Sequence, residues 1–130
     1  MSAVEIKLFE PVEWFGHLID MVYLRKPTGN HLQRHGEPRL WVSLAAGGAY
    51  AVDQPAAIDG YLADLLSLDG ERPIDGGGRA FYSKLALEDA QAVRDALFDF
   101  FTQARLRIVA RNAPPTRSDF SASNGDGSTS

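Results

Sequence analysis

The spacing of apolar residues changes along this chain of 130 residues, from a period of two near the N-terminus to a period of 3.6 near the C-terminus. Val4, Ile6 and Leu8 alternate with their neighbours, which is the pattern of a half-buried strand. A helix is predicted over residues 87–105, because an apolar stripe repeats there every three or four positions. Its members are Ala86, Ala90, Val93, Leu97, Phe100 and Ala104. Strands followed by helices predict an α+β fold.

The first strand is predicted to form an antiparallel hairpin with the run HLIDMVYLR over residues 17–25, after a connector ending near Gly16. One face of this second strand carries Ile19, Met21 and Tyr23. We expect Pro11 to end the first strand, because proline cannot donate a hydrogen bond to a ladder.

The nonapeptide LRKPTGNHL over residues 24–32 predicts a corner between this hairpin and the next elements. Arg25 and Lys26 are expected to lie in solvent. Pro27 disfavours helical geometry for the residue before it, and Thr28 is placed to cap a short helix.

A second hairpin is predicted around the Gly47–Gly48 turn, followed by a helix over residues 54–67 with Asp53 as its cap. The apolar stripe of this helix consists of Ile58, Tyr61, Leu62 and Leu65. The glycine-rich stretch 69–81 is expected to be a surface loop.

These elements predict one domain over residues 1–112, in which one or two antiparallel hairpins pack against two or three helices. Residues 113–130 are rich in Pro, Ser, Gly, Asn and Asp, and Phe120 is their one large apolar side chain. Such a segment cannot bury enough apolar surface to repay its ordering entropy, so a disordered tail is expected there.

Composition and charge restrict the classes of function. The chain has 13 Lys and Arg against 17 Asp and Glu, for a net charge of −4, so nucleic-acid binding is not expected. The absence of cysteine excludes disulfides, cysteine-ligated zinc and thiol catalysis. No apolar run approaches the roughly 18 residues that would cross a bilayer, so no membrane role is expected either.

Few residues suggest catalysis or metal binding. His31 and His35 have the i, i+4 spacing of a helical metal pair, but no third ligand accompanies them, and a solvated helix surface is the simpler interpretation. The run Gly76–Gly78 lacks the residues that complete a phosphate-binding loop. We therefore expect no catalytic residue, no cofactor and no metal; a small enzyme of unknown chemistry is the remote alternative.

The predicted long helix carries a candidate partner-binding surface. Glu88 and Asp89 lie in its first turn, where acidic side chains suit the helix dipole. Along one flank of the helix follow Arg94, Phe98, Phe101 and Arg105. Aromatic and arginine side chains are enriched at interface anchors, so these four residues are predicted to bind a partner. The alternative is that the flank packs on the sheet.

The order of these elements resembles that of tail assembly chaperones of long-tailed bacteriophages, of the kind found in Mu-like and P2-like phages. The N-terminal residues that carry the resemblance are Pro11, Val12, Gly16, Ile19, Leu24, Arg25, Pro27, Thr28 and Leu32. The C-terminal match runs from Leu85 to Ala90 and on to Phe100 and Phe101.

The resemblance implies a protein without enzymatic activity that coats the phage tape measure protein and keeps it soluble while the tail tube assembles. A tail tube protein is a second implied partner, and self-association into a homo-oligomer is left open. The implied location is the host bacterial cytoplasm, and the protein would be absent from the mature virion. The alternative function is a phage accessory protein on the same scaffold that binds and inhibits a host protein.

Overall fold

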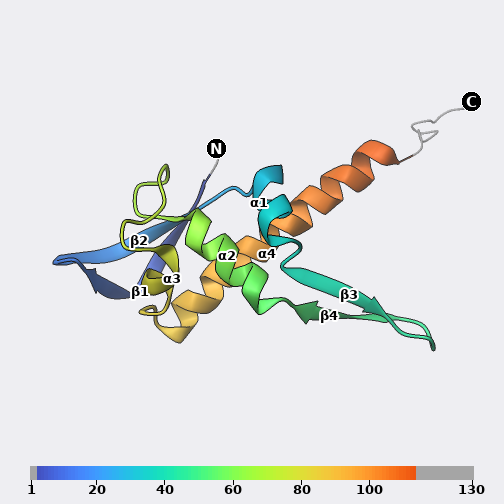
Figure 1. The fold of residues 1–130 in the computed structure, drawn as a ribbon, viewed down its shortest axis with the longest axis horizontal. Helices are drawn as coiled ribbons and strands as arrows, with labels where there is room; N and C mark the ends of the chain where they lie inside the picture. Colours follow the sequence, from blue (N-terminus) through green and yellow to red (C-terminus); the bar gives the residue numbers. More distant parts are fainter. Residues whose placement is uncertain (1–2, 114–130) are drawn as a thin grey trace, which may run out of the picture. The chain divides into compact units, whose positions relative to one another are not determined.

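The computed structural model describes residues 3–113, and this range forms the α+β fold predicted from the sequence (Figure 1). In chain order the elements are β1 (Ala3–Trp14), β2 (His17–Arg25), α1 (Gly29–His35), β3 (Arg39–Ser43), β4 (Ala49–Asp53), α2 (Pro55–Leu65), β5 (Leu66–Ser67), α3 (Gly78–Tyr82) and α4 (Leu87–Asn112). One compact unit comprises Met1–Phe100, and a second begins at Phe101. The single domain over 1–112 therefore stays a prediction, as does the tail over 113–130, because residues 114–130 lie outside the described residues.

The N-terminal hairpin is the predicted antiparallel pair, and β5 extends it to a three-stranded sheet in the order β1–β2–β5. Phe15 and Gly16 form its turn with φ angles of 50° and 79°, in the left-handed region that two-residue hairpin turns require. The buried face of β2 carries Val22 and Leu24, whereas Ile19, Met21 and Tyr23 are only half-buried.

Strand β1 does not end at Pro11 as predicted, because the proline lies within an irregular stretch of the strand. The register of the β1–β2 pair shifts between Lys7 and Val12, which leaves backbone groups of β1 without ladder partners. Asp89 of α4 replaces those partners: its Oδ1 accepts from the backbone N–H of Phe9 at 2.8 Å, and its Oδ2 accepts from Glu10 at 3.1 Å. The Asp89 side chain is therefore a buried link between α4 and the edge strand of the sheet.

The predicted apolar stripe of α2 is confirmed, since Ile58, Tyr61, Leu62 and Leu65 are all buried, and Ala57 is buried beside them. The prediction that residues 69–81 form a surface loop is wrong for part of that stretch. Ile74 and Phe81 are buried, and Gly78 packs directly against the backbone of α2. These long-range contacts convert a glycine-rich connector into part of the core.

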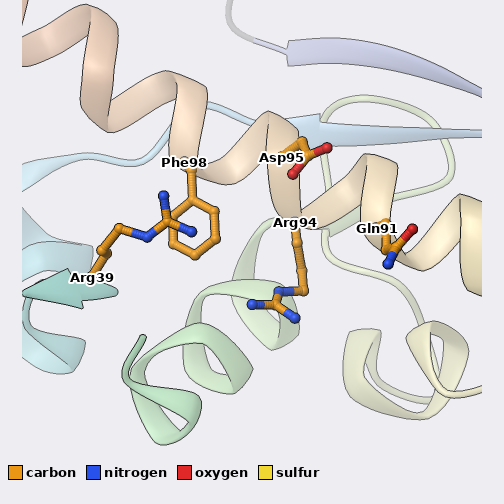
Figure 2. A pocket seen from close by; sticks show the side chains of 5 residues that line it. All are labelled: Arg39, Gln91, Arg94, Asp95 and Phe98. Carbon is orange, nitrogen blue, oxygen red and sulfur yellow. The ribbon is translucent and has the colours of Figure 1, made fainter. Parts of the chain in front are cut away.

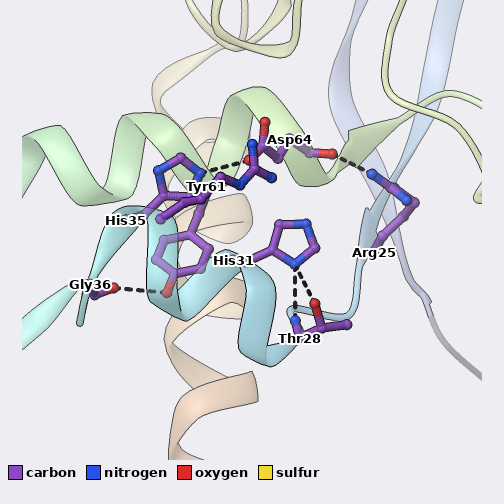
Figure 3. A network of polar contacts seen from close by, with 8 residues as sticks. Arg25, Thr28, His31, His35, Gly36, Tyr61 and Asp64 are labelled. Carbon is purple, nitrogen blue, oxygen red and sulfur yellow. Dashed lines mark hydrogen bonds and ion pairs between the residues drawn. The ribbon is translucent and has the colours of Figure 1, made fainter.

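Two histidines of α1, His31 and His35, contribute side-chain contacts to the corner after β2 (Figure 3). Thr28 is the N-cap of α1, and its backbone N–H donates to His31 Nδ1 at 3.0 Å. Burial lowers the pKa of His31, in keeping with a neutral ring that accepts at Nδ1. His35 Nε2 lies 2.6 Å from Asp64 Oδ2 of α2, and the absence of a side chain at Gly60 leaves room for the His35 ring.

Arg25 does not lie in solvent as predicted. Its guanidinium donates to the backbone carbonyl oxygen of Asp64 in α2 (Figure 3) and to that of Glu71, so it ties the end of β2 to α2 and to the segment that follows α2. Lys26 is exposed. Within residues 3–113, no helix combines the length and apolar character needed to cross a membrane.

Candidate partner-binding surface

The predicted site residues fall into two groups. Arg94 and Phe98 lie on the part of α4 that belongs to the first compact unit, where they line a shallow pocket with Arg39, Gln91 and Asp95 (Figure 2). Phe101 and Arg105 belong to the second unit, and Arg105 is exposed. That all four residues bind a partner stays a prediction.

Asp53 connects the pocket to the base of the second hairpin. Its Oδ1 accepts from Arg39 Nε at 2.8 Å, and its Oδ2 accepts from Arg94 Nη2 at 2.7 Å. The Arg39 guanidinium also lies over the Phe98 ring, with Cζ 3.9 Å from the ring centroid (Figure 2). Asp53 therefore does not cap α2 as predicted; Gln54 is the N-cap, and Asp53 joins two arginines from different elements.

This arrangement covers one side of the Phe98 ring. The ring is half-buried beneath Arg39, and Arg94 is half-buried in its ion pair with Asp53. Phe98 and Arg94 thus hold the base of β3 and β4 against α4. Sequence reasoning found these two residues but did not find Arg39 or Asp53.

The hairpin held by this cluster, β3–β4, has one face made of apolar side chains. Its register pairs Leu40 with Val52 and Val42 with Tyr50, so these four side chains share one face. Leu44 continues the same face beyond the end of β3. All five members of this apolar ribbon face are exposed: Leu40 45%, Val42 37%, Leu44 50%, Tyr50 48% and Val52 36%.

The opposite face of the ribbon differs in composition. It carries the small side chains of Ser43, Ala49 and Ala51, the 69% exposed Trp41, and the ion pair of Arg39 and Asp53 at its base. No Asp, Glu, Lys or Arg occurs between residues 40 and 52. Other exposed apolar residues, such as Phe9 and Leu18, are interspersed with charged residues on β1 and β2. The apolar ribbon face is thus an uncharged surface of the kind that marks interaction sites.

No protein-family model, curated protein or solved structure matches the chain. The strongest indication of a binding function within residues 3–113 is the apolar ribbon face, because its five apolar side chains are exposed together and carry no charge among them. The alternation of apolar residues at 40, 42, 44, 50 and 52, with no charge among them, is the sequence signal that would have identified it.

The other candidate groups have structural partners. His31 Nδ1 accepts a hydrogen bond from the backbone N–H of Thr28, and His35 Nε2 contacts the carboxylate of Asp64. Among residues 3–113, no group of three or more His, Asp or Glu side chains is arranged to hold a metal ion. The Gly76–Gly78 run supplies positive φ angles at Gly76 and Gly77 and close packing at Gly78.

The carboxyl group of Asp53 should titrate at low pH. The hydrogen bond from Arg39 is the main cause that lowers the pKa of Asp53 below its ordinary value of 3.8. A group with a lowered pKa adds stability that is complete above the unfolded value and is lost as the pH falls through the folded value. We expect an NMR titration of the Asp53 carboxyl carbon to give a midpoint below 3.8. Arg39→Gln should raise that midpoint, and an unchanged midpoint would refute the assignment of Arg39 as the main cause.

Proposed function

We propose that this protein is a phage tail assembly chaperone that binds the tape measure protein through the apolar ribbon face of β3–β4. It would act in the host bacterial cytoplasm, without enzymatic activity, and would leave before the virion matures. The observation that carries the proposal is the exposure of five apolar side chains on one uncharged face of a two-stranded ribbon. The resemblance in element order supplies the identity of the partner.

The chemistry of the face favours an apolar partner. A partner with charges at the contact would have to bury them against side chains that offer no counter-charge, which is costly. Side chains on one face of a strand repeat about every 6.8 Å, close to the roughly 6 Å between residues i and i+4 of a helix. The apolar stripe of an amphipathic helix can therefore lie along the ribbon, as helices do in other apolar grooves.

The contacts of α4 with Asp53 and Arg39 stabilise the base of the ribbon that carries this surface. Asp53 and Arg39 lie at the base of the ribbon, and their contacts with Arg94 and Phe98 hold that base in place. A two-stranded ribbon is at best marginally stable alone, so an anchored base keeps the apolar face presented in one conformation. Phe98 and Arg94 then act as positioning residues, and binding by Phe101 and Arg105 remains a separate proposal for the second unit.

The double variant Val42→Thr/Tyr50→Thr tests the proposal. These residues lie opposite each other on the apolar face. A Thr–Thr pair at these two positions keeps strand propensity and removes most of the apolar area that the pair itself contributes. Co-expressed with the tape measure protein of the same phage, the wild-type chain should keep that protein in the soluble fraction. The double variant should lower the soluble amount at least tenfold, measured by quantitative immunoblot of both fractions.

Ser43→Thr/Ala49→Thr is the matched control, because this pair occupies the same ladder on the opposite face. It should retain wild-type solubilisation. If the wild-type chain fails to keep the tape measure protein soluble, the chaperone function is wrong. If both double variants solubilise the partner as well as the wild type, the ribbon is not the binding surface.

A further inference from the structure

The β3–β4 ribbon has open edges as well as an open face. Within residues 3–113 the two strands form a sheet of their own, so each has one edge that pairs with no other strand. Backbone hydrogen bonds join Gln54 to Pro38 and Leu44 to Gly48. The even-numbered residues of the two strands therefore form the hydrogen-bonded pairs, and their N–H and C=O groups point toward the other strand of the hairpin. The pattern alternates along an antiparallel pair, and the N–H and C=O groups of Ala49, Ala51 and Asp53 therefore point outward from β4.

Between Ala49 and Val52, the outer edge of β4 lacks most of the features that normally prevent strands from pairing between molecules. Charged residues, proline and bulges are the usual protections of an edge strand. β1, an edge strand of the three-stranded sheet, has all of them: Glu5, Lys7, Glu10, Pro11, Glu13 and an irregular register. The β4 edge instead presents Ala49 and Ala51, whose small side chains leave its backbone accessible, and its first charge is Asp53 at the base.

We propose that two copies of this chain associate through their β4 edges in an antiparallel pair centred on Ala51, forming one four-stranded sheet. Ala51 then lies opposite Ala51 of the second copy and exchanges two backbone hydrogen bonds with it. Tyr50 lies opposite Val52 of the second copy, and Asp53 lies opposite Ala49. The proposal is independent of the chaperone function, because it follows from the edge rather than from the apolar face.

Side-chain and charge complementarity favour a second copy as the occupant. The Tyr50–Val52 contacts are aromatic–β-branched pairs, which stabilise neighbouring strands, and they form twice about the two-fold axis. No like charges meet, because each Asp53 faces an alanine and is already paired with Arg39 and Arg94. Pairing also raises the number of strands from two to four, which meets the requirement for a stable sheet.

The two-fold axis of this pair is perpendicular to the sheet, so the apolar ribbon faces of both copies lie on the same side. The result is one continuous apolar surface twice as large as that of a single copy. Pairing of short edges buries less area than a standard interface, so the dimer is expected to be weak and concentration-dependent.

Proline substitution distinguishes the two edges of the ribbon. The N–H groups of Ala51 on β4 and Ser43 on β3 both belong to non-hydrogen-bonded pairs and point outward. A proline at either position therefore leaves the bonds inside the hairpin intact but blocks its own edge. In sedimentation equilibrium of the full chain, Ala51→Pro should weaken dimerisation at least tenfold, whereas Ser43→Pro should leave it at the wild-type value.

A second measurement on the wild-type chain covers the case in which Ala51→Pro does not fold. In a mixture of ¹³C-labelled and unlabelled chains at high concentration, an intermolecular NOE should join the Hα atoms of Tyr50 and Val52. These atoms are close only across the proposed non-hydrogen-bonded pair, because residues i and i+2 of one strand are about 6.8 Å apart. A monomer at every concentration, a dimer lost in Ser43→Pro alone, or a dimer without this NOE would each overturn the proposal.

Discussion

Replacing Asp89 with alanine is expected to lower the free energy of unfolding by about 3 kcal/mol. The carboxylate is fully buried and accepts hydrogen bonds from the backbone N–H groups of Phe9 and Glu10. Alanine would remove both hydrogen bonds, and a hydrogen bond to a charged group contributes about 1.5–3 kcal/mol. The irregular stretch of β1 would then lose its attachment to α4. Urea unfolding followed by circular dichroism measures the change.

Glu88→Ala is the matched control, since Glu88 occupies the same first turn of α4 but is exposed. It should cost less than about 1 kcal/mol, the size of a favourable helix-dipole contact at the surface. Asp89→Asn should fall between the two, because the amide oxygen can serve one N–H while its NH₂ group faces the other. Equal losses for Asp89→Ala and Glu88→Ala would show that the dipole, rather than the link to β1, explains Asp89.

Asp89 also marks the limit of what the sequence could predict. Its place in the first turn of a helix was evident, but its partners lie 80 and 79 residues away, at an irregularity of β1. No local pattern encodes such a contact. Arg25 illustrates the same limit, because its carbonyl acceptors at Asp64 and Glu71 become neighbours only after β2 and α2 have packed.

The elements themselves were predictable where one face of an element is buried along its whole length. The stripe of α2 and the pairing of β1 with β2 follow from apolar periodicity, because burial imposes that period on the residues. The two-residue strand β5 is too short to show any period. Residues 69–81 have turn composition, and only tertiary packing explains why Ile74 and Phe81 are buried.

For the candidate site, helical geometry was sufficient to single out Arg94 and Phe98 on one flank of α4. It could not reveal that Arg39 covers the Phe98 ring or that Asp53 bridges two arginines, since 41 residues separate Arg94 from Asp53. These contacts change the interpretation of this flank of α4. Arg94 and Phe98 were predicted to bind a partner directly, and they also anchor the ribbon that presents the apolar ribbon face.

Gly78→Ala should destabilise the chain by about 3 kcal/mol, the upper end of the cost of overpacking a core. Gly78 is buried, and a Cβ atom there would overlap the carbonyl oxygen of Leu62 and lie 3.2 Å from Cα of Ala63. Both obstacles belong to the α2 backbone, so no side-chain rotation relieves them, and α2 and α3 must separate. Thermal unfolding should show a lower Tm, with loss of near-UV signal from the aromatic contact between Trp14 and Phe81.

Gly29→Ala provides the control, because Gly29 is also the first residue of a short helix but an added Cβ atom there would meet nothing within 4 Å. Alanine there should be neutral or slightly stabilising, since it reduces the conformational freedom of the unfolded chain. Gly77→Ala separates packing from backbone conformation: its surroundings are open, but its φ of 104° strains any L side chain. A Gly78→Ala variant as stable as Gly29→Ala would mean that α3 does not pack on α2 at this distance, and the glycine run would then be the surface loop that its composition predicts.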